Sequence, residues 1–367
     1  MDNQLFATKV FSQKILKWYD VRARILPWRS PPGKTADAYH VWLSEIMLQQ
    51  TTVATVGPYF EKFLNCWPTV QHLANASLDD VLVAWAGLGY YARARNLHKC
   101  AGEVCQKYGG HFPQSEKELL TLPGIGEYTA AAIASIAYGV PAVVVDGNIE
   151  RIITRVYRVQ EALPKSRSQI RELAARVSPE SRPGDYAQAL MDIGATICTP
   201  KKPRCSDCPV NVECAAYVTG DQEQFPKKAP KKTKPTRKAA VLWIENHHGE
   251  VLLRRREEKG LLGGMMEFPS TSWVEADYSE DDINALLSEL GDLDHQDVHK
   301  LGDRITHTFT HFHLHFTPHI LRLNEEDRVI SNHLYWVSPE KFAEIALPTL
   351  MTKVVSSVKA GQGILGL

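Results

Sequence analysis

The pattern of apolar and polar positions changes in character beyond the middle of the chain. Before residue 219, long runs of helix-forming residues are separated by Gly and Pro, as in 39–50 and 127–138, which is typical of helices. After residue 238, apolar and polar residues alternate in the short runs KAAVLWIEN, EVLLRRR, HTFTHFHLHF and HLYWVSP, and one helical stretch covers 281–290. Alternation of this kind predicts strands. We therefore expect a multidomain chain, mainly α at its N-terminal end and α+β or mainly β at its C-terminal end.

A basic, proline-containing stretch separates these two regions. The segment FPKKAPKKTKPTRK, residues 225–238, has three prolines, seven cations and almost no apolar residue, so it cannot bury enough surface to fold alone. We predict domains at 1–219 and 239–367, joined by a basic linker at 220–238. The cations of the linker either keep it extended and soluble or lie along a phosphate backbone.

Basic and acidic residues are unevenly distributed along the chain. Of the 367 residues, 44% are hydrophobic and 23% are charged, which is typical of ordinary globular domains. The net charge of zero divides into 24 Lys/Arg against 20 Asp/Glu in 1–219, 7 against 2 in 220–238, and 11 against 20 in 239–367. No apolar run is long enough to span a membrane, and the N-terminus lacks the apolar core of a signal peptide, so we expect a cytoplasmic protein.

A glycine-containing loop lies between two helical runs in LTLPGIGEYTAAAIASIAYG. Pro123, Gly124 and Gly126 follow the run 115–122 and precede an Ala-rich helix that begins near Glu127. The glycines allow a tight loop, and the N–H groups at the start of the next helix can then approach a phosphate. The loop is either an ordinary helix connection or a hairpin that grips the DNA backbone without reading its sequence.

Four of the seven cysteines fall within 17 residues. Cys198, Cys205, Cys208 and Cys214 have the spacing C-x6-C-x2-C-x5-C, and four such thiolates can surround one zinc ion or one iron-sulfur cluster. The spacing indicates metal ligation but does not choose the metal. The first loop also carries Lys201, Lys202 and Arg204, whose charges favour phosphate.

Two acids are distinguished by their surroundings. Glu45 lies in VWLSEIMLQQT, where apolar residues flank it on a helix, so its carboxyl is expected to keep its proton unusually well and to serve as a general acid. Asp146 follows the apolar run PAVVV in VDGN and is a candidate fixed anion. Pattern alone equally allows a surface-facing helix acid for Glu45 and a helix cap or Asx turn for Asp146.

Together, LPGIGEYTA, VDGN and the four cysteines resemble the helix-hairpin-helix base-excision glycosylase superfamily, in its endonuclease III-like branch with a [4Fe-4S] cluster. The resemblance covers roughly residues 26–217. Within that branch, the strings LPWR, SEIMLQQT and GLGYYARARN and the additional C-terminal domain resemble the MutY-type adenine DNA glycosylases.

The resemblance implies roles for individual residues. Glu45 matches the catalytic acid of the family and Asp146 its catalytic aspartate, while Tyr128 and Asn148 match supporting active-site positions. The remaining matches are to DNA-contacting positions: Gln50 and Tyr90 as wedges in the base stack, and Arg24, Leu26, Trp28 and Arg29 as the adenine pocket wall. Without the resemblance, Gln50 can be interpreted as a residue on a helix surface, and Tyr90 and Trp28 as core aromatic residues.

The C-terminal string GLLGGMMEFP resembles the Nudix fold. A working Nudix helix carries several acids of the form REUxEE for magnesium, whereas this chain has ALLSELGD, so we expect a Nudix-like recognition domain without hydrolase activity. The family reads 8-oxoguanine with a Phe-Ser-His turn, which Phe309, Thr310 and His311 match. Thr310 stands where serine is more usual; its hydroxyl keeps the donor and the acceptor, and its methyl group adds bulk.

Alternation also predicts that His311, His313 and His315 share one face of a strand. Three ligands on one strand point the same way without converging, which favours a solvated or DNA-facing surface over a metal site.

The resemblance implies a monofunctional enzyme that removes adenine mispaired with 8-oxoguanine or guanine in double-stranded DNA. Glu45 would protonate the adenine and Asp146 would stabilise the sugar cation, so we expect their surroundings to push the two pKa values apart. The alternative is a bifunctional glycosylase/lyase of the endonuclease III type, which needs an amine nucleophile where this chain has Tyr128. A Nudix hydrolase and a noncatalytic DNA-binding module are further alternatives. We expect a bacterial, DNA-associated monomer.

Overall fold

The computed structural model describes residues 2–230, 233–293, 298–301, 303–324, 328–329 and 333–365. The chain forms two compact units. The first unit contains 1–76 and 96–231, and the second contains 77–95 and 232–367.

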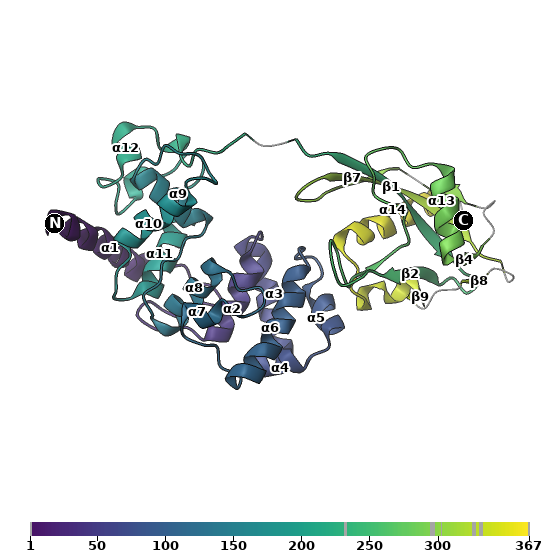
Figure 1. Cartoon of the computed structure of the whole chain (residues 1–367), viewed down its shortest axis with the longest axis horizontal. Helices are drawn as coiled ribbons and strands as arrows, with labels where there is room; N and C mark the ends of the chain where they lie inside the picture. Colours follow the sequence, from purple (N-terminus) through teal and green to yellow (C-terminus); the bar gives the residue numbers. More distant parts are fainter. Residues whose placement is uncertain are drawn as a thin grey trace. The chain divides into compact units, whose positions relative to one another are not determined.

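The first unit is helical. Its elements are α1 (Asp2–Arg22), α2 (Ala38–Leu48), α3 (Val53–Cys66), α4 (Val70–Asn75), α6 (Ala92–Tyr108, whose first residues belong to the second unit), α7 (Glu116–Leu119), α8 (Glu127–Tyr138), α9 (Gly147–Val156), α10 (Arg167–Val177), α11 (Pro183–Thr196), and α12 (Ala215–Thr219), with short 3-10 turns at Cys205–Asp207 and Gln222–Gln224. The helix α8 packs against α2 and α11, and α11 also packs against α1 and α9 (Figure 1).

Two predicted helices can be compared with the structure. The Ala-rich run forms α8 with the expected bounds of 127–138, and Gly139 ends it in the left-handed conformation. The run 39–50 forms α2 but stops at Leu48. Gln50 has a φ of 60°, which a right-handed helix does not accommodate, so the last two positions form a turn instead.

The second unit is built on a mixed sheet. Its elements are α5 (Leu78–Trp85), β1 (Thr236–Glu245), β2 (Val251–Arg255), β3 (Met266–Glu267), α13 (Glu280–Leu290), β4 (Gly291–Asp292), β5 (His299–Lys300), β6 (Ile305–Thr308), β7 (His313–Arg322), β8 (Arg328–Val329), β9 (Leu334–Val337), a 3-10 turn at Pro339–Glu344, and α14 (Thr349–Leu365). The strand order is β3-β2-β1-β7-β5, with β6 also paired to β7 and β9 to β2. Only β1 and β7 run parallel among these pairs of the described residues.

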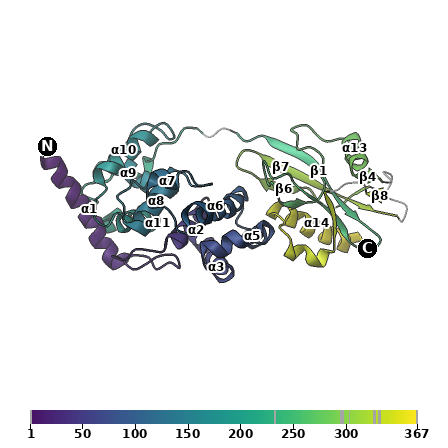
Figure 2. The ribbon, with the colours of Figure 1, turned by 60° about the horizontal axis from the view of Figure 1, so that its bottom comes forward.

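Successive side chains of β1 point to opposite faces of the sheet and pack in two cores. Ala239, Val241 and Trp243 pack in one cluster with residues of α14. Ala240 and Leu242 pack on the opposite face, in a cluster with residues of α13. Figure 2 shows α14 beside the sheet on one side and α13 on the other. The expected fold class, a mainly α N-terminal region and an α+β Nudix-like C-terminal region, is confirmed.

The run HTFTHFHLHF does not form one strand. It ends β6, makes a turn at 309–312 and begins β7, and the turn is closed by the N–H of Phe309, which donates to the Phe312 carbonyl at 2.9 Å. His311 therefore lies in the turn, and the prediction that it shares a strand face with His313 and His315 is wrong. The two later histidines do lie on one face of β7.

No helix in the described part of the chain is both long enough and apolar enough to cross a membrane.

Candidate active site

A cavity of about 430 Å³ opens within the helical unit. The segment after α1 and the helices α2, α8, α9 and α11 contribute its walls. Nine of the side chains expected from the sequence line it: Arg24, Leu26, Trp28, Arg29, Glu45, Gln50, Tyr128, Asp146 and Asn148. Positions up to 124 residues apart in the chain thus meet in one place. The cavity has the volume typical of a pocket for a small organic group.

Glu45 is held inside this cavity rather than on the surface of α2. Only 6% of the residue is exposed, so the surface-facing interpretation is wrong. The hydroxyl of Tyr128 donates to Oε2 of Glu45 at 2.5 Å. Burial raises the pKa of Glu45 to about 7, although the bond from Tyr128 and the charge of Arg29 act in the opposite direction. Near neutral pH this carboxyl can therefore hold a proton and give it up, as a general acid must.

Asp146 is both a helix cap and a cavity residue. Its Oδ1 accepts from the N–H groups of Asn148 at 3.0 Å and Ile149 at 2.7 Å, which caps α9, and its Oδ2 accepts from Nδ2 of Asn148 at 2.9 Å. Burial raises the pKa of Asp146, while these donors and Arg151 lower it. The prediction that the surroundings push the two pKa values apart is therefore not confirmed, because burial raises both of them. The donors around Asp146 act against the rise of its pKa without reversing it.

Arg151 was not predicted from the sequence, yet it connects the capped aspartate to the cysteine region. Its Nη2 donates to Oδ1 of Asn148 at 2.9 Å, and its Nε donates to the carbonyl of Cys198 at 2.7 Å. Nη2 also donates to the carbonyl of Gly194 at 2.7 Å. Asn148 is thereby held in one orientation, with its amide nitrogen toward Asp146. The sequence offered no signal beyond a cation on an amphipathic helix.

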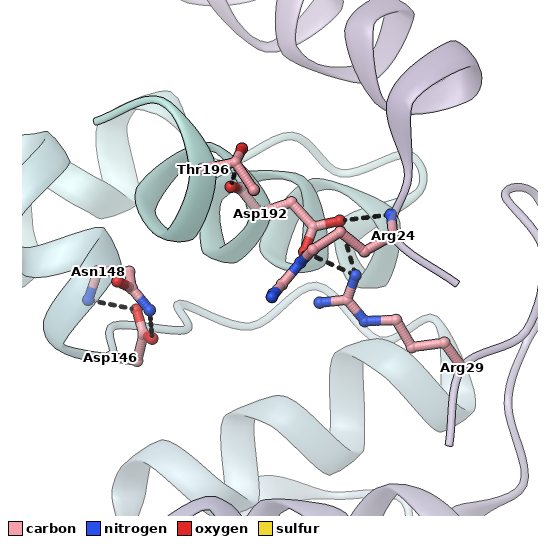
Figure 3. A network of polar contacts seen from close by, with 6 residues as sticks. All are labelled: Arg24, Arg29, Asp146, Asn148, Asp192 and Thr196. Carbon is pink, nitrogen blue, oxygen red and sulfur yellow. Dashed lines mark hydrogen bonds and ion pairs between the residues drawn. The ribbon is translucent and has the colours of Figure 1, made fainter. Parts of the chain in front are cut away.

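A second unpredicted residue, Asp192 of α11, anchors the pocket wall. Its carboxylate is fully buried and accepts from Nε of Arg24 at 2.5 Å and from Nη1 of Arg29 at 2.7 and 2.8 Å. The N–H of Arg24 also donates to Asp192, at 2.9 Å. Figure 3 shows both arginines directed at this carboxylate, with Asp146 and Asn148 paired separately. Asp192 therefore fixes the direction of two cations that line the cavity.

Other side chains line the cavity without having been predicted, notably Gln188 and Met191 of α11. Their helix reads as an ordinary core helix in the sequence. Trp28 is part of the pocket wall and also packs edge-on against Phe60, with the ring centroids 5.4 Å apart. The core and pocket interpretations of Trp28 therefore both hold.

The two residues expected to act as wedges share an uncommon backbone conformation. Gln50 has a φ of 60° and Tyr90 a φ of 50°, which is strained for residues other than glycine. Gln50 is exposed at the cavity, and 51% of Tyr90 is exposed, so Tyr90 is not aromatic core. The structure places both side chains where they are accessible.

The glycine loop joins α7 to α8. Gly124 has a φ of +75°, and a Cβ there would lie 2.8 Å from Cβ of Asn96, so both the conformation and the space exclude a side chain. Gly126 is the N-cap residue of α8 and has no side chain above the first N–H groups. The arrangement leaves those N–H groups accessible to an anion.

The four predicted cysteines line one small cavity of about 20 Å³, which Arg155 also lines. Nη1 of Arg155 lies 3.2 Å from Sγ of Cys198. Among the described residues, no three His, Cys, Asp or Glu side chains are close enough to hold one metal ion. In a cubane each cysteine binds a different iron atom, so the four sulfurs need not converge on one point. Four cysteine thiols gathered at one cavity are a donor set that fits an iron-sulfur cluster.

The turn between β6 and β7 carries the residues expected to read the lesion. Phe309 stacks against Trp273 with ring centroids 5.7 Å apart, while Thr310 and His311 are exposed. The hydroxyls of Tyr90 and Thr310, which belong to the same compact unit, lie 3.2 Å apart. The turn is thus packed at its aromatic base and presents polar groups at its tip.

Comparison with known proteins identifies both regions. Residues 43–180 match the model of the HhH-GPD superfamily of base excision DNA repair proteins, and residues 240–357 match the NUDIX domain model. The first unit is also similar to a solved thermostable thymine-DNA glycosylase, at 32% identity and a TM-score of 0.52 over 58% of this chain and 97% of that one. A non-covalent endonuclease III–DNA complex, at 21% identity and a TM-score of 0.50 over 59% of this chain and 97% of that one, shares the fold. The chain is therefore a helix-hairpin-helix base-excision repair protein with an additional Nudix-type domain.

Full-length relatives narrow this class further. The human adenine DNA glycosylase is 38% identical over 94% of this chain and 73% of its own length. The adenine DNA glycosylase of Buchnera aphidicola subsp. Acyrthosiphon pisum is 35% identical over 95% of this chain and 98% of its own length. The chain belongs to the adenine DNA glycosylase family.

Proposed function

We propose that this protein is a monofunctional DNA glycosylase that hydrolyses the N-glycosidic bond of adenine mispaired with 8-oxoguanine in duplex DNA. The observation that carries the proposal is the single cavity that contains both Glu45 and the capped Asp146. One carboxyl there retains a proton near neutral pH, and the other is surrounded by N–H donors that favour its anion.

The chemistry begins with an adenine nucleotide extruded from the duplex into the cavity. Glu45 donates its proton to the adenine ring, which makes the base a better leaving group. Asp146 stabilises the positive charge that develops on the sugar as the bond breaks, or forms a covalent bond to it, and water completes the hydrolysis. Tyr128 and Asn148 hold the two carboxyls in place through their hydrogen bonds.

The lining of the cavity supports hydrolysis over lyase chemistry. A lyase forms a Schiff base with the sugar and needs a lysine or another amine at the reacting carbon. No lysine is among the described side chains that line the cavity, and the position after the glycine loop is Tyr128, whose hydroxyl is bonded to Glu45. The arrangement therefore favours water as the nucleophile.

The cysteines would hold a [4Fe-4S] cluster that stabilises the loop 198–214. Its exposed Lys201 and Lys202 would then be presented to the DNA backbone. The turn with Phe309, Thr310 and His311 would contact 8-oxoguanine on the opposite strand. The helical stretch ALLSELGD differs from the acid-rich REUxEE form that binds magnesium in a Nudix hydrolase, which supports a recognition role for that domain.

The experiment that tests this proposal uses a duplex with one 8-oxoguanine·adenine pair, labelled on the adenine strand. Incubation should leave the labelled strand intact until alkali cleaves it at the abasic site. A strand nicked before alkali, together with a protein–DNA adduct trapped by borohydride, would support the bifunctional lyase alternative and refute the monofunctional mechanism.

A further inference from the structure

A second large recess lies on the sheet domain, next to the turn at 309–312. Its volume is about 530 Å³. We call it the basic recess because cations from separate places in the chain line it. Its lining residues are Lys238, Asp277, Tyr278, Lys300, Asp303, Arg304, His315 and Thr317.

The strand pairing explains why these side chains meet. The parallel register places Lys238 of β1 opposite His315 of β7, so both project from the same face of the sheet. Lys300 is opposite His319 on the other side of β7, and Arg304 directly precedes β6. The recess therefore crosses three adjacent strands, on the face that α13 covers further along.

Two cations of the recess differ from three neighbouring arginines of this acidic domain. Arg254, Arg255 and Arg256 each make an ion pair with a carboxylate. Within the described part of the chain, Lys300 and Arg304 make no ion pair, although 239–367 contains 20 acids against 11 Lys/Arg. Two cations without partners on one recess leave charge available for an anion.

The acidic side chains that line the recess do not prevent an anion from binding there. Asp277 pairs with Lys238 at 2.6 Å, but 83% of the Asp277 side chain is exposed. An exposed pair of this kind is worth less than about 1 kcal/mol, so a ligand anion can replace Asp277 on Lys238. Asp303 is exposed at the rim.

A buried polar atom in the recess also lacks a partner. Nδ1 of His315 is inaccessible to solvent and makes no hydrogen bond in the described structure. A polar atom buried in this way is costly unless a ligand or water satisfies it. The recess thus contains one ring nitrogen that no described residue satisfies.

The position of the recess indicates the source of that group. Thr308 and His313, which flank the lesion-reading turn, are bonded side chain to side chain at 2.9 Å. His315 lies two residues further along β7 on the same face, a distance of about 6.6 Å at the rise of a strand. Phosphates of one DNA strand recur at about 3.4 Å of helix axis, so the recess lies within roughly two nucleotides of the turn.

We propose that the basic recess binds a backbone phosphate of the DNA strand that carries the lesion, close to the base read by the turn. The inference rests on the proposed function, because that function brings the lesion to the turn at 309–312. The ligand chemistry is a phosphate ester, because Lys238, Lys300 and Arg304 give the described lining its positive charge.

The test measures the binding of the full-length protein to a duplex with 8-oxoguanine opposite a non-hydrolysable 2′-fluoro-adenosine, over a series of salt concentrations. In Lys300→Gln/Arg304→Gln, the slope of log affinity against log salt should fall by about 0.9 for each phosphate that the protein no longer neutralises. Asp277→Asn should bind the duplex more tightly than the unchanged protein, because a competing carboxylate is removed. Lys341→Gln, an exposed position outside the recess, is the matched control and should behave as the unchanged protein.

Two outcomes would overturn the proposal. The first is an unchanged affinity and salt slope in the double variant. The second is displacement of the duplex by millimolar deoxyguanosine monophosphate but not by inorganic phosphate, which would assign the recess to a free nucleotide. Adenine release at saturating protein should be unchanged in all these variants. If the unchanged protein releases no adenine, the proposed function is contradicted. The salt dependence of duplex binding is measured separately and would still test the phosphate site.

Discussion

Replacing Glu45 with glutamine should abolish adenine excision and at the same time stabilise the folded protein above neutral pH. Burial raises the pKa of Glu45 from 4.5 to about 7, so the folded chain binds a proton at this site more tightly than the unfolded chain. Folding stability therefore falls as the pH rises from about 4.5 to about 7, because the carboxyl must ionise inside the cavity. The difference in pKa corresponds to about 3 kcal/mol.

Glutamine keeps an acceptor for Tyr128 but carries no charge at any pH. In urea unfolding, the stability advantage of Glu45→Gln should be near zero at about pH 4.5 and should grow to as much as about 3 kcal/mol at about pH 8. Glu61→Gln, at an exposed position of α3, controls for the removal of one carboxylate. An advantage independent of pH, or a variant less stable than the unchanged protein at about pH 8, would refute the assignment of a raised pKa to this residue.

Three further predictions follow from the contacts around the cavity and the cysteines. Asp192→Asn leaves Arg24 and Arg29 without their buried anion, so it should lower the free energy of unfolding by roughly 3 kcal/mol. The freed charge of Arg29 should also lower the pKa of Glu45, so the rate of single-turnover excision should begin to fall at a lower pH. An unchanged pH profile of excision would contradict the anchoring role of Asp192. Asp146→Asn retains a good helix cap and should remain folded and bind duplex DNA while losing excision, which circular dichroism and a binding assay can separate; substantial excision would remove Asp146 from the mechanism. The purified protein should contain iron and sulfide at about four atoms each per chain, and stoichiometric zinc after anaerobic purification would refute the cluster.

The parts of the site that could be predicted from sequence are those with a local signature. The apolar flanks of Glu45 indicate its burial, and the apolar run before Asp146 followed by Gly and Asn indicates a capping position. The run KAAVLWIEN also predicts the strand that the structure shows as β1. In each case the residues that surround the position in the fold are adjacent to it in the sequence, so a local pattern is enough to predict its surroundings.

The residues that sequence reasoning missed depend on distant positions. Asp192 receives its hydrogen bonds from Arg24, 168 residues earlier, and Arg151 bonds the carbonyl of Cys198, 47 residues later. A buried acid or cation of this kind reads as a solvated helix face until its partners are known. The single strand expected over 307–316 failed for a different reason, because two strands and a tight turn of aromatic residues keep the same alternation.

The central claim is that Glu45 and Asp146 together remove adenine from DNA as a free base. Chromatographic measurement of free adenine, released in a single turnover from an 8-oxoguanine·adenine duplex, tests this most directly. The account predicts release by the unchanged protein, with a rate that falls as the pH rises through about 7, and almost none by Glu45→Gln although the variant still binds the duplex. Adenine release by Glu45→Gln at the rate of the unchanged protein would contradict the account.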